Sequence, residues 1–257
     1  MRSGVAWLGL LLMVASAAWW EWTATPSTPR PNEAAAVPET ASVVVIDPGH
    51  GGQDSGAMCA GMLEKDLTLD VAQRIDRLLQ AQGVATVLTR VGDAYVSLPE
   101  RVALTNRVPH CILVSIHFNE DNKPVSSGIE TYYAEYQTPP RPALASWLPF
   151  WQRVSSPEPN LESQSLAGFI QQQLVAHTQA LNRGTKPKQF FVITNLRHPA
   201  VLVEGGFLTN REDIAKIANP EYREQIAIAI AEGILHYREL AKNRPATLAV
   251  NASGRAE

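Results

Sequence analysis

The clearest pattern along the chain is an alternation of short apolar runs with longer segments whose apolar residues recur at helical spacing. The short runs are Val43–Asp47, Val84–Thr89, Cys111–His117, Ile129–Ala134 and Val201–Glu204. Their length and their content of branched residues predict strands, several of them buried on both faces of a sheet.

Four segments between or after these runs are predicted to be helices. The first is Asp66–Gln82, with Asp66 as its N-cap and Gly83 ending it. The second begins at the capping box of Ser97 and runs to about Val108. The third is a long helix with one apolar face formed by Leu166, Phe169, Ile170, Leu174 and Leu181 and closed by Gly184, and the fourth runs from Asn219-Pro220 to about Leu240.

Strands that alternate with helices in this way predict a single α/β domain, with a mostly parallel central sheet and helices on both faces. The predicted organisation is a signal peptide or membrane anchor at 1–22, a Pro/Thr/Ala-rich linker at 23–41, a catalytic domain at 42–241 and a disordered tail at 242–257.

The first residues have the pattern of an export signal. Arg2 is followed by the almost wholly apolar run Val5–Trp20, and Ala15-Ser16-Ala17 is a small-residue cleavage site. A cleaved signal is favoured over an uncleaved anchor. In both cases the protein is expected to work outside the cytoplasm, in the periplasm or cell envelope.

Residues 137–162 interrupt the α/β rhythm with several prolines and with Trp147 and Trp151. A connection of this length is usually a lid, a binding loop or disordered. The alternatives are a surface excursion, a flap over the site and a docking site for an activator or regulatory protein.

Composition narrows the function further. The net charge of −3 and the absence of a Lys/Arg cluster disfavour nucleic-acid binding, and a monomer is favoured. Cys59 and Cys111 are predicted to be free, because parallel strands would place them at opposite ends of the sheet.

The loop "DPGHGGQDSG" after the first strand raises the question of its ligand. A phosphate loop is weakly supported, since no lysine lies between Gly49 and Gly61 and Asp54 stands where a dinucleotide loop needs its third glycine. A metal site is better supported. Of the six histidines only His50 and His117 follow strands, so both are expected at the rim where the carboxyl ends of the strands meet.

A carboxylate is needed to complete a set of two imidazoles and one carboxylate. Glu64 is favoured by its spacing; Asp66 and Asp54 are rivals that are better explained as a helix cap and a turn residue. Asp47 is expected to orient an imidazole. Glu204 ends an apolar strand, where a carboxylate is costly unless it is paired, metal-bound or catalytic. The alternative for Glu204 is a salt bridge to an arginine: Arg183, Arg197 or Arg211.

Several blocks occur together in a characteristic order: "VVVIDPGHGGQDSGA", "LEKDLTLDVA", "LVSIHFN", "GIETYY", "NRGTK" and "PAVLVEGGFLTN". With them the chain resembles the zinc-dependent N-acetylmuramoyl-L-alanine amidases of the AmiC-like class, the Amidase_3 family, over roughly Val43 to Tyr237. The resemblance implies a peptidoglycan hydrolase that cuts between N-acetylmuramoyl residues and L-alanine. It implies one zinc ion held by His50, Glu64 and His117, with Glu204 as the catalytic glutamate.

Two other functions fit the same residues. A zinc exopeptidase would use the same constellation on peptides, and a wall-binding module would keep the fold without catalysis. Mass spectrometry of digested peptidoglycan distinguishes the amidase from the exopeptidase, and an assay that finds no bound zinc would favour the wall-binding module.

Overall fold

The structure, a computed structural model, describes residues 42–139 and 159–242. The predicted signal or anchor at 1–22, the linker at 23–41, most of the 137–162 insert and nearly all of the tail at 242–257 therefore lie outside the described residues. None of the helices in the described part is both long enough and apolar enough to cross a membrane.

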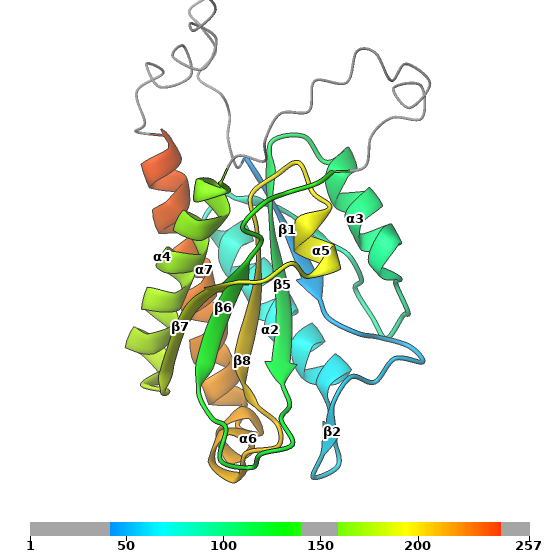
Figure 1. The fold of residues 1–257 in the computed structure, drawn as a ribbon, viewed down its shortest axis with the longest axis vertical. Helices are drawn as coiled ribbons and strands as arrows, with labels where there is room; N and C mark the ends of the chain where they lie inside the picture. Colours follow the sequence, from blue (N-terminus) through cyan, green and yellow to red (C-terminus); the bar gives the residue numbers. More distant parts are fainter. Residues whose placement is uncertain (1–41, 140–158, 243–257) are drawn as a thin grey trace, which may run out of the picture. The chain divides into compact units, whose positions relative to one another are not determined.

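A six-stranded sheet forms the centre of the domain (Figure 1). In spatial order its strands are β4 (Ala85–Leu88), β1 (Val43–Pro48), β5 (Cys111–Asn119), β8 (Ala200–Phe207), β6 (Ile129–Tyr133) and β7 (Asn182–Pro187). The first four are parallel, β6 is antiparallel to β8, and β7 is parallel to β6. The mostly parallel sheet of the prediction is confirmed.

Helices cover both faces of this sheet, as predicted (Figure 1). They are α2 (Glu64–Ala81), α3 (Leu98–Arg107), α4 (Leu161–Thr178), α5 (Phe191–Thr194), α6 (Arg211–Ile217) and α7 (Pro220–Lys242). A two-stranded hairpin, β2 (Met58–Cys59) with β3 (Met62–Leu63), lies between the first strand and α2.

The alternation of side chains along the strands divides the core in two. On one face Val44, Ile112 and Val203 pack with the apolar sides of α2, α4 and α7. On the other face Leu113 and Leu202 pack with α3 and α5. In Figure 1, α3 and α5 lie over the upper part of the sheet, and neither reaches the carboxyl ends of β5 and β8. Side chains at those ends that point to this second face are therefore not covered by α3 or α5 and can form a site.

Several predicted boundaries were wrong. Helix α2 begins at Glu64 after Leu63, so Asp66 lies in its first turn and is not the N-cap. Helix α4 ends at Thr178, because Gln179 adopts a left-handed conformation with φ of 51°. Leu181 is therefore not helical, and Gly184 belongs to β7, a strand that the prediction missed.

Other local predictions are confirmed. The capping box of Ser97 and Glu100 is present at the start of α3. Cys59 and Cys111 are both free thiols, and burial raises the pKa of Cys111 to about 11, which keeps that thiol protonated.

Candidate metal centre and its neighbours

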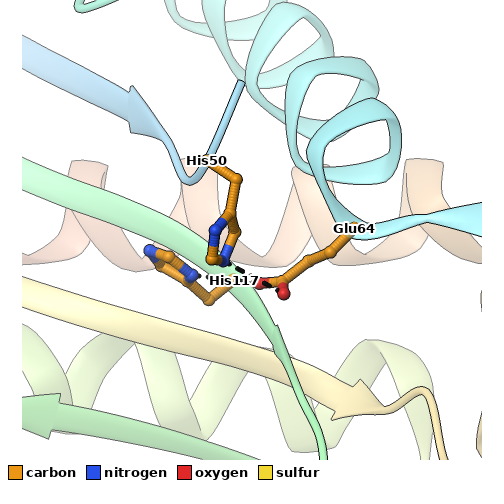
Figure 2. Close-up of side chains that lie close together, drawn as sticks. All are labelled: His50, Glu64 and His117. Carbon is orange, nitrogen blue, oxygen red and sulfur yellow. Dashed lines mark hydrogen bonds and ion pairs between the residues drawn. The ribbon is translucent and has the colours of Figure 1, made fainter. Parts of the chain in front are cut away.

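Two imidazoles and a carboxylate meet at the carboxyl ends of β1 and β5 (Figure 2). His50 follows β1, His117 lies near the end of β5, and Glu64 is the first residue of α2. His50 Nε2 lies 3.0 Å from Glu64 Oε2, and His117 Nδ1 lies 3.0 Å from Glu64 Oε1. One donor atom from each residue lies within 4.8 Å of the others, so this group could hold a metal ion.

Backbone amides orient the Glu64 carboxylate. The amide of Ala57 donates to Oε2 over 3.0 Å, and the amide of Phe118 donates to Oε1 over 3.1 Å. Burial alone would raise the pKa of Glu64, but the hydrogen bonds and charges of His117 and His50 outweigh it and hold the pKa far below its usual range. Glu64 is thus ionised, as a metal ligand must be.

The glycines of the opening loop make room for these side chains. A Cβ on Gly49 would lie 2.3 Å from Cε1 of His117, and a Cβ on Gly56 would lie 2.5 Å from Oε2 of Glu64. Gly56 also has φ of +62°, which other residues rarely adopt. Positions 49 and 56 are therefore glycine because the imidazole and the carboxylate occupy the space of a side chain there. A bound phosphate is not needed to explain these glycines.

Two buried arginines hold the backbone that carries His50. Arg101 donates to the carbonyl oxygens of Pro48 and His50 over 2.7 and 2.6 Å. Arg90 donates to the carbonyl oxygens of Pro48 and Gly49 over 3.1 and 2.8 Å. His50 itself has φ of 59°, a conformation that costs free energy unless its surroundings impose it. We infer that the two guanidinium groups fix this conformation.

Asp47 does not contact an imidazole, and this part of the prediction was wrong. It accepts hydrogen bonds from Thr89 Oγ1 over 2.6 Å, from Ser115 Oγ over 2.8 Å and from Arg101 Nη1 over 2.5 Å. Asp47 lies on the buried strand β1, and its side chain points into the face of the sheet below the loop. It supports His50 indirectly, by binding Arg101.

A second carboxylate besides Glu64 contacts the His50 ring: it is Asp54, a rival ligand in the prediction that was better explained as a turn residue. Its Oδ2 lies 3.0 Å from His50 Nδ1, while its Oδ1 accepts from the Gly56 amide. Burial opposes ionisation of Asp54, but the hydrogen bonds of His50 and Gly56 lower its pKa. An ionised carboxylate only accepts, so Nδ1 donates to Asp54, and Nε2 is the ring atom that faces Glu64 and the centre of the cluster.

Glu204 lies next to this cluster, on β8. It is the register partner of His117, and the strand continues to Phe207, so Glu204 does not end its strand as predicted. The side chain is buried, and among the described residues no donor reaches its Oε2. Burial first, and then the charges of Glu64 and Glu130, raise the pKa of Glu204 well above the usual value.

The predicted alternative of a salt bridge from Glu204 to Arg183 is not found. Arg183 Nε instead donates to Glu130 Oε2 over 2.9 Å. Glu130 is the register partner of Glu204 on β6 and also binds Lys186 and the hydroxyl of Tyr132. The sequence analysis missed Glu130, although its position two residues before Tyr132 in "GIETYY" places both side chains on one face of a strand.

A mostly parallel sheet that gathers two imidazoles and a carboxylate beside a second carboxylate, whose Oε2 has no donor among the described residues, is the arrangement of a metal-dependent hydrolase. The Amidase_3 family, described as N-acetylmuramoyl-L-alanine amidase, matches residues 44–236. The chain belongs to this family, whose named members are peptidoglycan amidases.

Three relatives illustrate the match. N-acetylmuramoyl-L-alanine amidase LytC of Bacillus subtilis is 36% identical over 78% of this chain, which spans about a third (36%) of LytC. The amidase AmiC2 of Nostoc punctiforme is 37% identical, with a TM-score of 0.65 over 78% of this chain and 98% of the solved chain. An amidase of Clostridium difficile 630 is 33% identical, with a TM-score of 0.66 and the same coverages.

Proposed function

We propose that the chain hydrolyses the amide bond between N-acetylmuramoyl residues and the L-alanine of peptidoglycan stem peptides, with one zinc ion held by His50, Glu64 and His117. The observation that carries this proposal is the convergence of these three side chains beside the buried, unpartnered Oε2 of Glu204. Membership of the amidase family supplies the substrate class.

The donor set fits zinc. Two imidazole nitrogens and one carboxylate oxygen, with a further position left open, are the ligands of catalytic zinc sites. The rings of His50 and His117 are 23% and 20% exposed, so the centre can be reached from solvent. When bound, zinc supplies Lewis-acid chemistry: it polarises a carbonyl group and lowers the pKa of a water molecule.

The chain's own residues do the rest of the work. Glu64 and the two histidines provide the ligands of the metal ion. Asp54 holds the His50 ring through Nδ1, so that Nε2 is the atom that faces the ion. Glu204, through Oε2, accepts the proton of the attacking water and returns it to the leaving nitrogen of L-alanine. Its raised pKa favours such an exchange, since a carboxylate of higher pKa is a stronger base.

The site of action belongs to this proposal as well. Peptidoglycan lies outside the cytoplasm, and the apolar segment Val5–Trp20 after Arg2 has the pattern of an export signal. We therefore place the protein in the periplasm or cell envelope. An activator that docks at 137–162 and the AmiC-like subdivision stay predictions.

The test is a digest of purified peptidoglycan by the zinc-loaded protein, the chelator-treated protein and the chelator-treated protein with zinc restored. The expected products are glycan strands without peptides and intact stem peptides that begin with L-alanine, lost with chelator and regained with zinc. Shortened stem peptides would point instead to an exopeptidase. Binding to peptidoglycan without products or bound zinc would point to a wall-binding module.

A further inference from the structure

Three cationic side chains line the second face of the sheet beside Glu204. Arg183 and Lys186 lie on β7 and both bind the buried Glu130, whereas Lys188 follows that strand immediately. Glu130 thus binds two cations, and Lys188 adds a third positive charge beside them.

Lys188 differs from the other two in its partners. Its ammonium group lies 4.5 Å from the centre of the Phe190 ring and 5.3 Å from that of Tyr132, and these two rings meet edge to face at 5.2 Å. Among the described residues, no carboxylate forms an ion pair with Lys188, which is exposed. Its backbone amide is fixed by a hydrogen bond of 2.9 Å to the carbonyl oxygen of Tyr133. The charge is therefore held in place by two rings and is open to a ligand.

The ring pair connects Lys188 to the reaction centre. Tyr132 donates its hydroxyl hydrogen to Glu130 Oε1 over 2.7 Å, and Glu130 lies opposite Glu204 on the neighbouring strand. Neighbouring strands are about 4.8 Å apart, so the rings of Tyr132 and Phe190 lie within roughly two strand spacings of Glu204. The positive charge of Lys188 also acts on Glu204, since it opposes the rise in the pKa of that carboxyl group.

We propose that Lys188, held on the rings of Tyr132 and Phe190, binds a carboxylate group of the stem peptide, with Lys186 strengthening the positive field. This rests on the proposed function. A stem peptide carries free carboxylates close to the scissile bond, and the second residue lies within about 7 Å of it at roughly 3.5 Å per residue. A cation with no anionic partner of its own gains most from such a ligand.

The experiment compares two soluble muropeptides that differ only after L-alanine, where one carries glutamate with a free carboxylate and the other carries its carboxamide. Dissociation constants are measured with the zinc-loaded Glu204→Gln protein, which retains the face without turnover. The same background carries Lys188→Met, Lys188→Arg and, as a matched control on the exposed surface of α6, Lys216→Met.

We expect the parent to bind the carboxylate peptide about tenfold more tightly, because a hydrogen bond to a charged group contributes roughly this factor. Lys188→Met should abolish the preference, whereas Lys188→Arg and Lys216→Met should keep it. Equal binding of both peptides by the parent, or an undiminished preference in Lys188→Met, would overturn the proposal.

The proposed function is tested separately by the products of the unsubstituted enzyme. Cleavage at another bond would overturn the amidase activity, while the binding comparison would still decide whether Lys188 recognises a carboxylate. The steady-state constants add a second readout: Lys188→Met should raise KM for the carboxylate peptide more than KM for the carboxamide peptide.

Discussion

Glu204 and Glu130 lie opposite each other on neighbouring strands, are both buried, and have opposite surroundings. Glu130 is 1% exposed and is bound by Arg183, Lys186, Tyr132 and Asn119. Glu204 is 9% exposed, and no described donor reaches its Oε2.

The two pKa values diverge for this reason. Burial disfavours ionisation of both residues, but the hydrogen bonds from Lys186, Tyr132 and Arg183 outweigh it at Glu130 and lower the pKa there. At Glu204 burial is not compensated, and the ionised Glu130 adds to the rise. Glu130 is thus held by its ion pairs and hydrogen bonds, whereas Glu204 keeps an oxygen available for a proton.

The largest effect should come from Glu204→Gln. Loss of the proton acceptor should lower kcat by at least about 10²-fold to 10⁴-fold, while zinc content stays at the level of the unsubstituted protein. In the metal-free protein at pH 7 the free energy of unfolding should stay equal or rise, because burial opposes ionisation of the carboxyl group and the amide cannot ionise. Turnover of zinc-loaded Glu204→Gln at the original rate would remove Glu204 from the mechanism.

The sequence predicted the convergence of His50, Glu64 and His117 because polar residues follow the strands there. His50 and His117 were found because each follows or ends a buried run, and Glu64 because it stands between that loop and a helix. The sheet type and four of the six described helices, α2, α3, α4 and α7, followed from periodicity, whereas the short helices α5 and α6 were missed. Periodicity does not show which strands lie side by side. The pairing of β6 with β8 brings Glu130 beside Glu204, although they are 74 positions apart in the sequence.

The partners of the loop were missed for the same reason. Arg101 reaches Asp47 and His50 from α3, about fifty residues away, and Asp54 looks like an ordinary turn residue until its distance to His50 is known. Sequence spacing also could not show that Gly49 and Gly56 leave room for an imidazole and a carboxylate.

Asp47→Asn extends the comparison to a third buried carboxylate, one with a buried cationic partner. Removing its charge leaves the guanidinium group of Arg101 uncompensated, which should lower the free energy of unfolding by about 3–5 kcal/mol. Chemical denaturation of the metal-free protein measures it. Because Arg101 also holds the His50 carbonyl, zinc affinity should fall too; unchanged stability and affinity would show that the arginine clamp does not depend on Asp47.

Glu130→Gln should act on stability in the opposite direction to Glu204→Gln. We expect a loss of about 1–3 kcal/mol at pH 7, because charge-assisted hydrogen bonds are replaced by weaker ones while Arg183 and Lys186 stay partly exposed. The folded pKa of Glu130 is lowered, so its contribution is complete above the unfolded value near ~4.3 and disappears as the pH falls through the folded pKa.

Denaturation curves of the metal-free protein and of Glu130→Gln from pH 7 to pH 3 test this dependence. The difference between the two should be greatest above about pH 5 and should shrink below about pH 4. A difference that stays constant with pH would mean that Glu130 contributes through packing and not through its charge.

The smallest effect is expected at Asp54, the exposed carboxylate that contacts Nδ1 of His50. Asp54→Asn should weaken zinc binding by about 10-fold to 100-fold, because an amide no longer fixes the ring with a charge-assisted hydrogen bond from Nδ1. Competition with a chromophoric chelator measures this change. Asp66→Asn is the matched control, since Asp66 is an exposed acidic residue in the first turn of α2. Equal zinc affinity of the two variants would mean that His50 is positioned by the loop backbone and its two arginines alone. The contact between Asp54 and His50 would then contribute nothing to zinc binding.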